Sequence, residues 1–448
     1  MSRRPTHLER VAAAVAAAYL AGDWDPPAMG RRAKRALGTR RHWPTELART
    51  VRHEYPERPA DRPRELAGFI RACQLFVDAV TGTGPPLRIH IWMVSPTEMG
   101  STPWPVPAIP DLTALAGWLG VTPDHLDWFA DRRSLERRAP AEQLRHYHRR
   151  WVGKADGSSR LLEAPKRELK DLQRQVLHQI LDHIPAHPAA HGFRPGCSVL
   201  TGASRHTGRA VVVRLDLEAF FASVTAGRVY GIFRRAGYPE PVAHALTALC
   251  TTTAPRTVLR SAPPPGGAYL VDPRRRLLQR LAQPHLAQGS PTSPALANLA
   301  AFGLDRRLTG LAGRLGADYT RYADDLILSG DRSLVRHAAR FVDLVRTIAA
   351  DEGFQLHETK TRVQTAAQRQ TVTGVVVNRH PNIARTDYDR LRAVLHDAAT
   401  SGPEAANRAG HPDFRAHLLG RISWMVSVNP TRAGKLEQAF AAIHWPEA

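Results

Sequence analysis

Two adjacent carboxylates, Asp324 and Asp325, stand between an aromatic and apolar run before them and an apolar run after them. Residues 318–322 and 326–328 have the composition of short strands, which predicts a hairpin with the two carboxylates at its tip. Neighbouring carboxylates repel each other, so burying them is costly unless a cation neutralises them. Hard oxygen ligands with no Cys or His nearby favour Mg²⁺ or Mn²⁺. The alternative is a solvated Asp-Asp turn, and the apolar flanks favour the metal site over it.

A third carboxylate, Asp216, ends a largely apolar strand that begins at Val211. Three carboxylates on two adjacent strands are what a two-metal site for phosphoryl transfer requires. In such sites two cations about 3.5–4 Å apart stabilise the attacking and leaving oxygens of an in-line displacement. Glu218 lies close by in the sequence, but we leave it out of the predicted metal site.

The charge of the chain points to a polyanionic partner. The 448 residues carry 62 Lys and Arg against 41 Asp and Glu, a formal net charge of +21. Such an excess favours nucleic acid first and an anionic membrane second. An Arg-rich composition inherited from a GC-rich genome is the bland alternative. It explains why Arg exceeds Lys, but not why basic residues so outnumber acidic ones.

The cysteines and the hydropathy indicate a cytoplasmic protein. The three cysteines are scattered without CxxC spacing, which argues against a zinc site or a disulfide framework and fits a reducing compartment. No run of about 18 apolar residues occurs, so no membrane span is predicted. The Ala-rich stretch 11–20 is short, and Glu9 before it and residues 22–24 after it indicate a soluble helix rather than a signal peptide.

Hydrophobic periodicity gives a coarse map of the elements. Residues 1–80 read as helical, with Thr45 as the N-cap of one helix and a single helix over 64–80. Residues 81–110, rich in Pro and Gly, read as a linker with one strand-like stretch at 87–92. The remaining predicted elements are helices at 111–119, 122–129, 169–184, 228–236, 241–249, 295–311 and 334–350, a hairpin around 154–158, strand-like residues 372–378, an irregular segment 252–280 and a helical end over 386–443.

Several stretches resemble the sequence boxes of reverse transcriptases, and among these the bacterial retron type. The resemblance covers roughly residues 110–435 and lies in six places. They are Tyr322–Asp325 (the YxDD box), Asp216–Phe221, Gln288–Pro294 (QGxxxSP), Gly353–Lys360, Val372–Gly374 (the VTG signature of retron enzymes) and Gly202–His206, which resembles their NAxxH signature with Gly202 in place of Asn.

The resemblance implies a set of metal ligands and a sugar gate. Asp216, Asp324 and Asp325 would hold two Mg²⁺ ions, with the backbone carbonyl of Leu217 as a further ligand. Phe221 would lie under the incoming sugar, where an aromatic ring excludes a 2′-hydroxyl and selects dNTPs. The alternative is that Phe220 and Phe221 are both core residues. Since adjacent residues on a strand face opposite ways, we expect one of them to be free for the site.

Further residues would hold the nucleotide. Gln288 would hydrogen-bond it, and Gly289 would let the backbone approach it. Arg160, with Lys154 as a second candidate, would grip the triphosphate from the predicted hairpin, and a solvated charge is the equal alternative for both. Lys360 would protonate the pyrophosphate leaving group, or is only a basic residue near the site. For His191 and His206 we expect a structural or RNA-contacting role.

The fold implied is α+β, a right-hand polymerase with a helical N-terminal extension. The domains would be residues 1–105 (extension and linker), 106–380 (fingers and palm) and 381–448 (helical thumb). Within them, the fingers would take residues 140–210 and 251–290, the palm 211–250 and 291–380, and the thumb about 385–445. We expect the palm to be an antiparallel sheet with helices on one face.

The function implied is that of an RNA-directed DNA polymerase of retron type. It would copy a structured noncoding RNA from dNTPs, prime from a 2′-hydroxyl, and make a branched RNA–DNA product that serves antiphage defence with an effector protein. The alternatives are a group II intron, CRISPR-associated or abortive-infection reverse transcriptase, and a catalytically silent RNA-binding scaffold. The VTG signature argues against the intron type, and the three carboxylates argue against the silent scaffold.

Overall fold

The computed structural model describes residues 6–82, 86–94, 96–132, 135–139 and 141–445, and it divides into two compact units. Unit 1 comprises residues 1–185 and 224–300, and unit 2 comprises residues 186–223 and 301–448. Each unit is therefore built from separate stretches of the chain. The domain boundaries at residues 105 and 380 remain predictions from the sequence.

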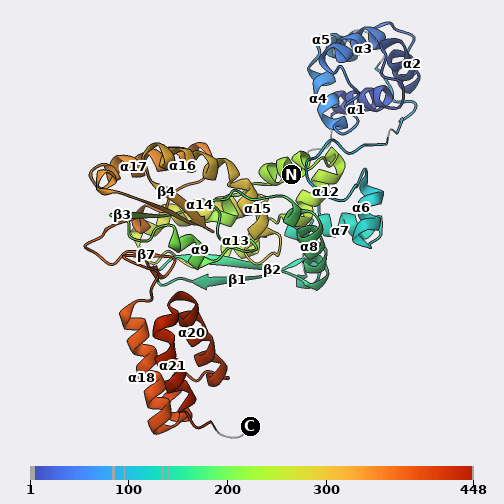
Figure 1. Cartoon of the computed structure of the whole chain (residues 1–448). Coiled ribbons are helices and arrows are strands. Elements are labelled where there is room, and N and C mark those ends of the chain that lie inside the picture. Colours follow the sequence, from blue (N-terminus) through green and yellow to red (C-terminus); the bar gives the residue numbers. More distant parts are fainter. Residues whose placement is uncertain (1–5, 83–85, 95, 133–134, 140, 446–448) are drawn as a thin grey trace. The chain divides into compact units, whose positions relative to one another are not determined.

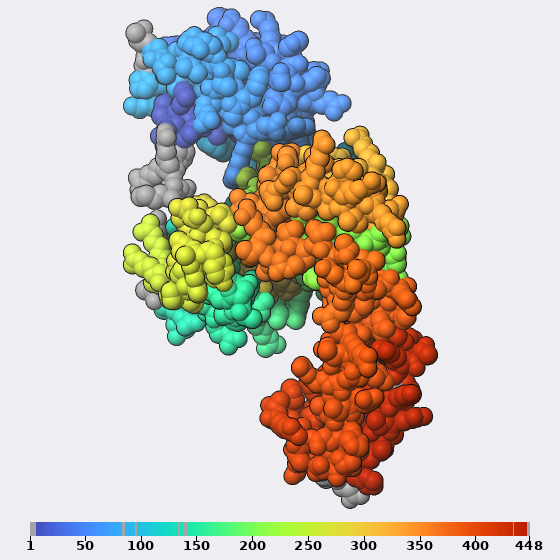
Figure 2. All heavy atoms as spheres, turned by 90° about the vertical axis from the view of Figure 1, so that its left-hand side faces the viewer, coloured from blue at the N-terminus to red at the C-terminus, as the bar shows by residue number. Residues whose placement is uncertain are grey.

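Unit 1 begins with a helical bundle that has its own core (Figures 1 and 2, blue). Its helices are α1 (His7–Leu20), α2 (Pro26–Leu37), α3 (Trp43–Glu54), α4 (Pro63–Ala72) and α5 (Gln74–Thr81). The helical reading of this region is correct, but two details were wrong. Helix α3 begins at Trp43, where Pro44 fits the first turn, so Thr45 is not its N-cap. The single helix expected over 64–80 is interrupted at Cys73, whose backbone is extended.

The rest of unit 1 is a hairpin with helices. Strands β1 (Tyr147–Gly153) and β2 (Ser159–Pro165) pair antiparallel, as expected. The helices are α6 (Leu112–Leu119), α7 (Pro123–Ala130), α8 (Arg167–Gln179), α11 (Ala226–Arg235), α12 (Glu240–Cys250), α13 (Arg256–Arg260), α14 (Val271–Leu281) and α15 (Ser293–Ala300), with 3₁₀ turns at Glu136–Arg138, Glu142–Leu144, Leu181–His183 and Ala268–Leu270.

Two predictions for unit 1 need correction. The segment 252–280 is not irregular, because it contains α13 and most of α14. The Pro- and Gly-rich run 263–267 and the basic run 274–276 made the segment read as irregular, and helix α14 buries only Leu281. Residues 87–92 form no strand. Instead, the amides of His90 and Ile91 both donate to the carbonyl of Ala36 at the end of α2. Residues 83–85 and 95 of the predicted linker lie outside the described residues.

Unit 2 is built on a four-stranded antiparallel sheet, as expected for the predicted palm. The strands lie in the order β4 (Asp318–Tyr322), β5 (Asp325–Gly330), β3 (Val211–Asp216) and β6 (Arg362–Thr365). Helices α16 (Phe302–Arg314) and α17 (Arg332–Asp351) pack on the sheet (Figure 1). The single helix predicted over 295–311 is wrong. The helical conformation is interrupted at Ala301, which separates α15 from α16.

Smaller elements complete unit 2. Helices α9 (Val199–Ser204) and α10 (Phe220–Ser223) flank β3 in the sequence, and a 3₁₀ turn covers Glu358–Lys360. The VTG residues form the tight turn between β7 (Thr371–Val372) and β8 (Val375–Val376). Thr373 and Gly374 have φ of 46° and 88°, as expected for a two-residue hairpin turn of the primed type.

The chain ends in a helical bundle, as the sequence predicted. It consists of α18 (Arg385–Ser401), α19 (Pro403–Ala406), α20 (Phe414–Val428) and α21 (Pro430–Ala441). Its core contains four buried leucines, Leu391, Leu395, Leu418 and Leu436, together with Ala, Ile and Met side chains. Among the described helices of the whole chain, none is both long enough and apolar enough to cross a bilayer.

A buried ion pair joins the sheet of unit 2 to α16. The Arg321 side chain, 0% exposed, donates from Nε and Nη2 to the two carboxylate oxygens of Asp305 at 2.8 and 2.7 Å. The hydroxyl of Tyr319 donates to the same carboxylate at 2.8 Å. The guanidinium also lies over the ring of Phe220, 5.5 Å from its centroid. Arg321 belongs to β4, so this network fixes the strand that leads into the Asp324 turn.

We expect Asp305→Asn to destabilise unit 2 by about 3–5 kcal/mol, because it leaves the Arg321 guanidinium buried without a counter-charge. The matched control is Asp343→Asn, which removes an exposed carboxylate paired with Arg346 on α17 and should cost under about 1 kcal/mol. Thermal and urea unfolding followed by circular dichroism would measure both. Equal effects of the two substitutions would contradict the structural role of the buried pair.

Candidate active site

The register of the sheet places the three predicted carboxylates together at one end of β3 and β5. Asp216 is paired directly opposite Asp325 across these strands. Asp324 lies in the two-residue turn between β4 and β5, and its carbonyl accepts from the amide of Leu217 at 2.9 Å. The tip of the hairpin is therefore Ala323-Asp324, while Asp325 is the first residue of β5.

Two basic side chains partly balance this negative charge. The Nζ of Lys360 lies 3.3 and 3.4 Å from the two carboxylate oxygens of Asp216. The guanidinium of Arg214 lies 3.9 Å from a carboxylate oxygen of Asp325. The pKa of Asp325 is nevertheless raised from its ordinary value of 3.8 to about 6, first by burial and then by the Asp324 and Asp216 carboxylates. A cation at this place would relieve that repulsion.

The donor chemistry of this cluster fits a hard divalent cation. The side chains of Asp216 and Asp325 are 16% and 29% exposed, so both can be reached from solvent. Among the residues that the structure describes, however, no three acidic, His or Cys side chains already converge as a formed metal site. The cluster thus supplies the right ligand type on adjacent backbone positions, and its side chains must turn to enclose an ion.

The Asp324 turn is supported from beneath by the loop that precedes α9. Ala323 has a φ of 55°, a left-handed conformation that costs a non-glycine residue free energy. Gly192 packs directly against it, because a Cβ at Gly192 would lie 2.7 Å from the amide nitrogen of Ala323. The amide of His191 donates to the carbonyl of Arg321 at 2.8 Å. The loop therefore acts as a further edge of the sheet, and it requires glycine at this position.

His206 is a structural residue of this hairpin. It is 0% exposed, and its two ring nitrogens lie 2.7 Å from the hydroxyls of Ser329 on β5 and Thr320 on β4. Burial lowers the pKa of His206 to about 3, so the ring is neutral. Of the two roles expected for it, the structural one applies. Gly202, which replaces Asn in the NAxxH-like stretch, is buried in α9 and packs against the side chain of His191.

An aromatic cluster lies beside the carboxylates. Phe220 is 4% exposed, whereas Phe221 is partly exposed. The expectation that only one of them is a core residue is right, but the reasoning from strand alternation was wrong because both lie in the short helix α10. The ring of Phe221 is 6.0 Å from that of Phe193, which is 46% exposed and 6.3 Å from Tyr322. Phe193 was not predicted from the sequence.

The other predicted nucleotide contacts belong to unit 1. The loop containing Gln288 and Gly289 is bound to β2, since the amide of Glu163 donates to the carbonyl of Gln288 at 2.9 Å. Gly289 has a φ of 134°, and a Cβ there would lie 3.0 Å from the carbonyl oxygen of Glu163. This close approach explains the glycine. Arg160 on β2 and Lys154 in the hairpin turn are both exposed, as either of their predicted roles requires.

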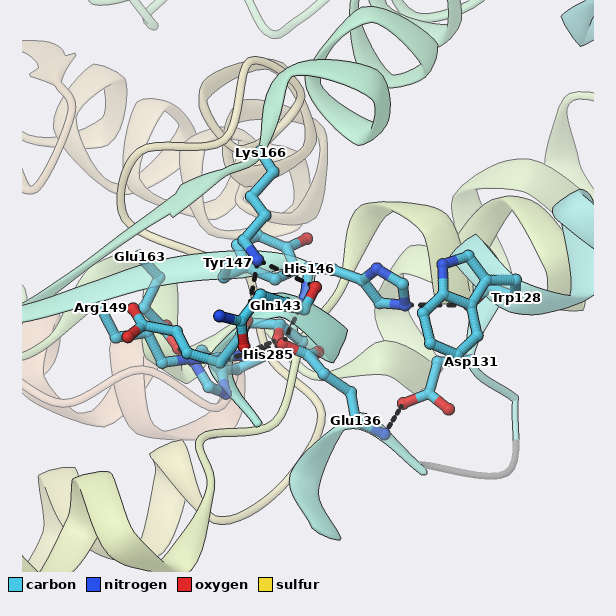
Figure 3. A network of polar contacts seen from close by, with 12 residues as sticks. Trp128, Asp131, Glu136, Gln143, His146, Tyr147, Arg149, Glu163, Lys166 and His285 are labelled. Carbon is cyan, nitrogen blue, oxygen red and sulfur yellow. Dashed lines mark hydrogen bonds and ion pairs between the residues drawn. The ribbon is translucent and has the colours of Figure 1, made fainter. Parts of the chain in front are cut away.

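A buried charge network holds this loop and hairpin together (Figure 3). Arg149 on β1 bonds the carboxylates of Glu136 and Glu163 at 2.9 and 3.0 Å, and His285 bonds Glu163 at 2.7 Å. The other ring nitrogen of His285 faces the carbonyl of Gln283 at 2.7 Å. His285 therefore links the Glu163 carboxylate on β2 to the backbone of residue 283. Sequence patterns gave no signal for this network, since its members are far apart in the chain.

We expect Asp325→Asn, with EDTA present, to stabilise the chain by about 3 kcal/mol at pH 8 and by only about 1 kcal/mol at pH 4.5. A carboxyl whose pKa is higher in the folded than in the unfolded chain destabilises the fold as pH rises through that interval, here from 3.8 to about 6. The full penalty is about 3 kcal/mol. Thermal melts at the two pH values would measure it, with the exposed Asp343→Asn as control. The same gain at both pH values would contradict the raised pKa.

The sequence of the chain is similar to proteins of a known family. Residues 152–377 match the model of the reverse transcriptase (RNA-dependent DNA polymerase) family. The chain is similar to the retron Mx65 reverse transcriptase of Myxococcus xanthus, with 43% identity over 301 residues, and to the retron Mx162 enzyme of the same organism, with 39% over 305 residues. It is also similar to the retron Ec86 reverse transcriptase of Escherichia coli, with 32% identity over 271 residues.

These matches cover 66%, 65% and 60% of this chain, respectively. They span 65% and 59% of the two Myxococcus proteins and 72% of the Escherichia protein. The matched family region contains Asp216, Phe221, Gln288, the Asp324-Asp325 pair and Lys360. By sequence, and with an antiparallel sheet that carries its carboxylates as the family boxes predicted, this chain belongs to the retron reverse transcriptases.

Proposed function

We propose that the chain is an RNA-directed DNA polymerase of retron type. The observation that carries the proposal is the pairing of Asp216 with Asp325 across β3 and β5, with Asp324 in the adjoining turn. Family membership supports the same activity. Phosphoryl transfer needs positioned charge more than covalent chemistry, and a cluster of carboxylates on a rigid sheet provides it.

The site residues have distinct roles in the proposed reaction. Asp216, Asp324 and Asp325 would bind two Mg²⁺ ions, or Mn²⁺, with the Leu217 carbonyl as a further ligand. When bound, the ions would stabilise negative charge on the attacking and leaving oxygens. Lys360, which contacts Asp216, would give a proton to the leaving pyrophosphate.

Further residues would select and hold the nucleotide. Phe221 would exclude a ribose 2′-hydroxyl from the space beside the carboxylates. Gln288 would hydrogen-bond the incoming dNTP, and the backbone at Gly289 would approach it closely. Arg160 or Lys154, on the exposed hairpin of unit 1, would contact the triphosphate.

The domain organisation that we propose is that of a right-hand polymerase. The sheet of unit 2 would be the palm, the β1–β2 hairpin would belong to the fingers, and the bundle α18–α21 would be the thumb. Basic residues of these parts would bind the phosphate backbone of the RNA–DNA duplex, and binding would weaken with salt.

The template and product are further parts of the proposal. The template would be a structured noncoding RNA, copying would begin from a 2′-hydroxyl of that RNA, and the product would be a branched RNA–DNA hybrid. The relatives named as retron reverse transcriptases support this class of reaction. The product would act in the cytoplasm in antiphage defence, together with an effector protein.

We expect Asp324→Asn to lower dNTP incorporation at least about a hundredfold while primer–template binding changes less than about threefold, because the carboxylate acts on the transition state. Single-nucleotide extension and fluorescence anisotropy would measure the two quantities. Asp351→Asn, an exposed carboxylate of the same unit, is the control and should extend normally. Extension by the Asp324 variant at the control's rate would refute the two-metal assignment.

Removing the proposed gate should relax sugar selection. We expect Phe221→Ala to raise incorporation of ribonucleotides relative to deoxyribonucleotides by roughly 10–200-fold, the range that steric exclusion of a small group gives. The measurement is kcat/KM for dGTP and GTP on one primer–template. Phe193→Ala, which alters the neighbouring ring of the cluster, is the control for a general loss of packing. An unchanged ratio in the Phe221 variant would remove this residue from the gate.

A further inference from the structure

The N-terminal bundle has a concentrated patch of cations that the polymerase site does not explain. In residues 31–41, six of the eleven residues are Arg or Lys and none is acidic. The bundle also lies outside the region matched to the reverse transcriptase family, which begins at residue 152. A role for these cations must therefore be sought in the bundle itself.

One of the six cations is structural. Arg32 turns back into the bundle, where its guanidinium donates to the carbonyls of Ala18, Tyr19 and Asp23 at 2.7, 2.8 and 2.7 Å. The other five are Arg31, Lys34, Arg35, Arg40 and Arg41, and we call them the basic patch. Four of the five are exposed, and Lys34 is half-buried.

The basic patch is held in place by regular structure. Arg31, Lys34 and Arg35 have the i, i+3, i+4 spacing that puts side chains on one face of α2. Helix α2 ends at Gly38, whose φ of 60° turns the chain back, and the Thr39 amide donates to the carbonyl of Lys34 at 3.0 Å. This turn places Arg40 and Arg41 immediately beyond the same helix end.

The patch lacks the partners that a purely structural cluster would have. Over the described residues, the ion pairs of the N-terminal bundle involve Arg58, Arg62, Arg71 and, through Asp61, Arg234. Among these described residues, no carboxylate pairs with a member of the basic patch. Favourable interaction with the helix dipole accounts for Lys34 and Arg35 in the last turn of α2. It does not account for the three remaining arginines, whose mutual repulsion is left without an internal counter-charge.

An exposed aromatic side chain lies on the segment that crosses the end of α2. The amides of His90 and Ile91 bond the carbonyl of Ala36 at 2.8 and 3.2 Å, and the ring of His90 contacts Gly38. On this segment Ile91 and Trp92 are 43% and 52% exposed. A cationic surface beside an exposed ring is the combination that binds single strands, since cations contact phosphates and rings stack on bases.

We propose that the basic patch and Trp92 form a second binding site for single-stranded nucleic acid, separate from the polymerase site. The ligand would be a stretch of unpaired RNA or DNA, held by its phosphodiester backbone and by a base stacked on Trp92. This proposal does not depend on the catalytic one, because it concerns binding without dNTPs and residues outside the matched family region.

The test uses the full chain and a labelled ten-nucleotide RNA strand. The patch variant is K34Q/R35Q/R40Q/R41Q, and the matched control, R49Q/R52Q/R62Q/R71Q, removes four exposed cations elsewhere in the same bundle. Stoichiometric titration counts the strands bound per molecule. We expect the patch variant to bind one strand fewer than the wild type, while the control variant keeps the wild-type number.

Salt dependence gives a second readout. The site lost in the patch variant should have a log–log salt slope of about −3, from roughly 0.7 for each of four phosphate contacts. An equal number of bound strands and an equal slope in the wild type and the patch variant would overturn the proposal. An equal loss in both variants would also overturn it, because the effect would then be one of overall charge.

Two further arms test the nature of the ligand. Trp92→Ala should weaken binding of the single strand at this site by about 5–150-fold, the effect of one stacked base, and should leave binding of a ten-base-pair RNA duplex unchanged. Equal loss for strand and duplex would overturn the single-strand assignment. If the patch variant instead loses binding to phosphatidylglycerol vesicles and keeps every RNA site, the surface binds membranes and the proposal is wrong.

Discussion

The pairing of Asp216 with Asp325 across two neighbouring strands is the constraint on which the rest of unit 2 depends. The strand register holds the two backbones at directly opposite positions, so the carboxylates stay close enough to repel each other. Two cations offset this repulsion in part, Lys360 beside Asp216 and Arg214 beside Asp325. The repulsion that remains contributes to the raised pKa of Asp325, and a bound cation would relieve it.

A cluster of neighbouring carboxylates needs a rigid scaffold, and the buried contacts behind the hairpin provide it. Arg321 and Asp305 tie β4 to α16, while His206 joins β4 to β5 as a neutral ring. Gly192 closes against the strained turn at Ala323. These contacts use polar groups that are fully satisfied, which makes the arrangement specific as well as stable. Buried contacts away from the carboxylates therefore stabilise the hairpin against the repulsion between them.

The sequence predicted those parts of the site that depend on local pattern. Apolar runs identified β3 and the Asp324 hairpin, whereas the roles that the family boxes suggested for Phe221 and Gln288 remain predictions. It could not reveal the partner of Arg321, because Asp305 lies on a different element and nothing in the local pattern marks the pair. It missed α14 for a different reason, since the helix follows a Pro- and Gly-rich run and contains three consecutive arginines. Its error at Phe221 came from assuming a strand where the chain turns into α10.

The basic residues of this chain are of two kinds, those enclosed by hydrogen-bond acceptors and those exposed to solvent. Hydrogen-bond acceptors of the fold surround the guanidinium groups of Arg32, Arg149 and Arg321, so these groups are not available to a ligand. Arg40 and Arg41 are exposed and have no such enclosure, so their charge remains available to a ligand. A net charge of +21 therefore does not by itself locate a binding surface. A binding surface is located by the cations that have no acceptors within the fold. At the end of α2 these cations are concentrated enough to attract a polyanion from solution.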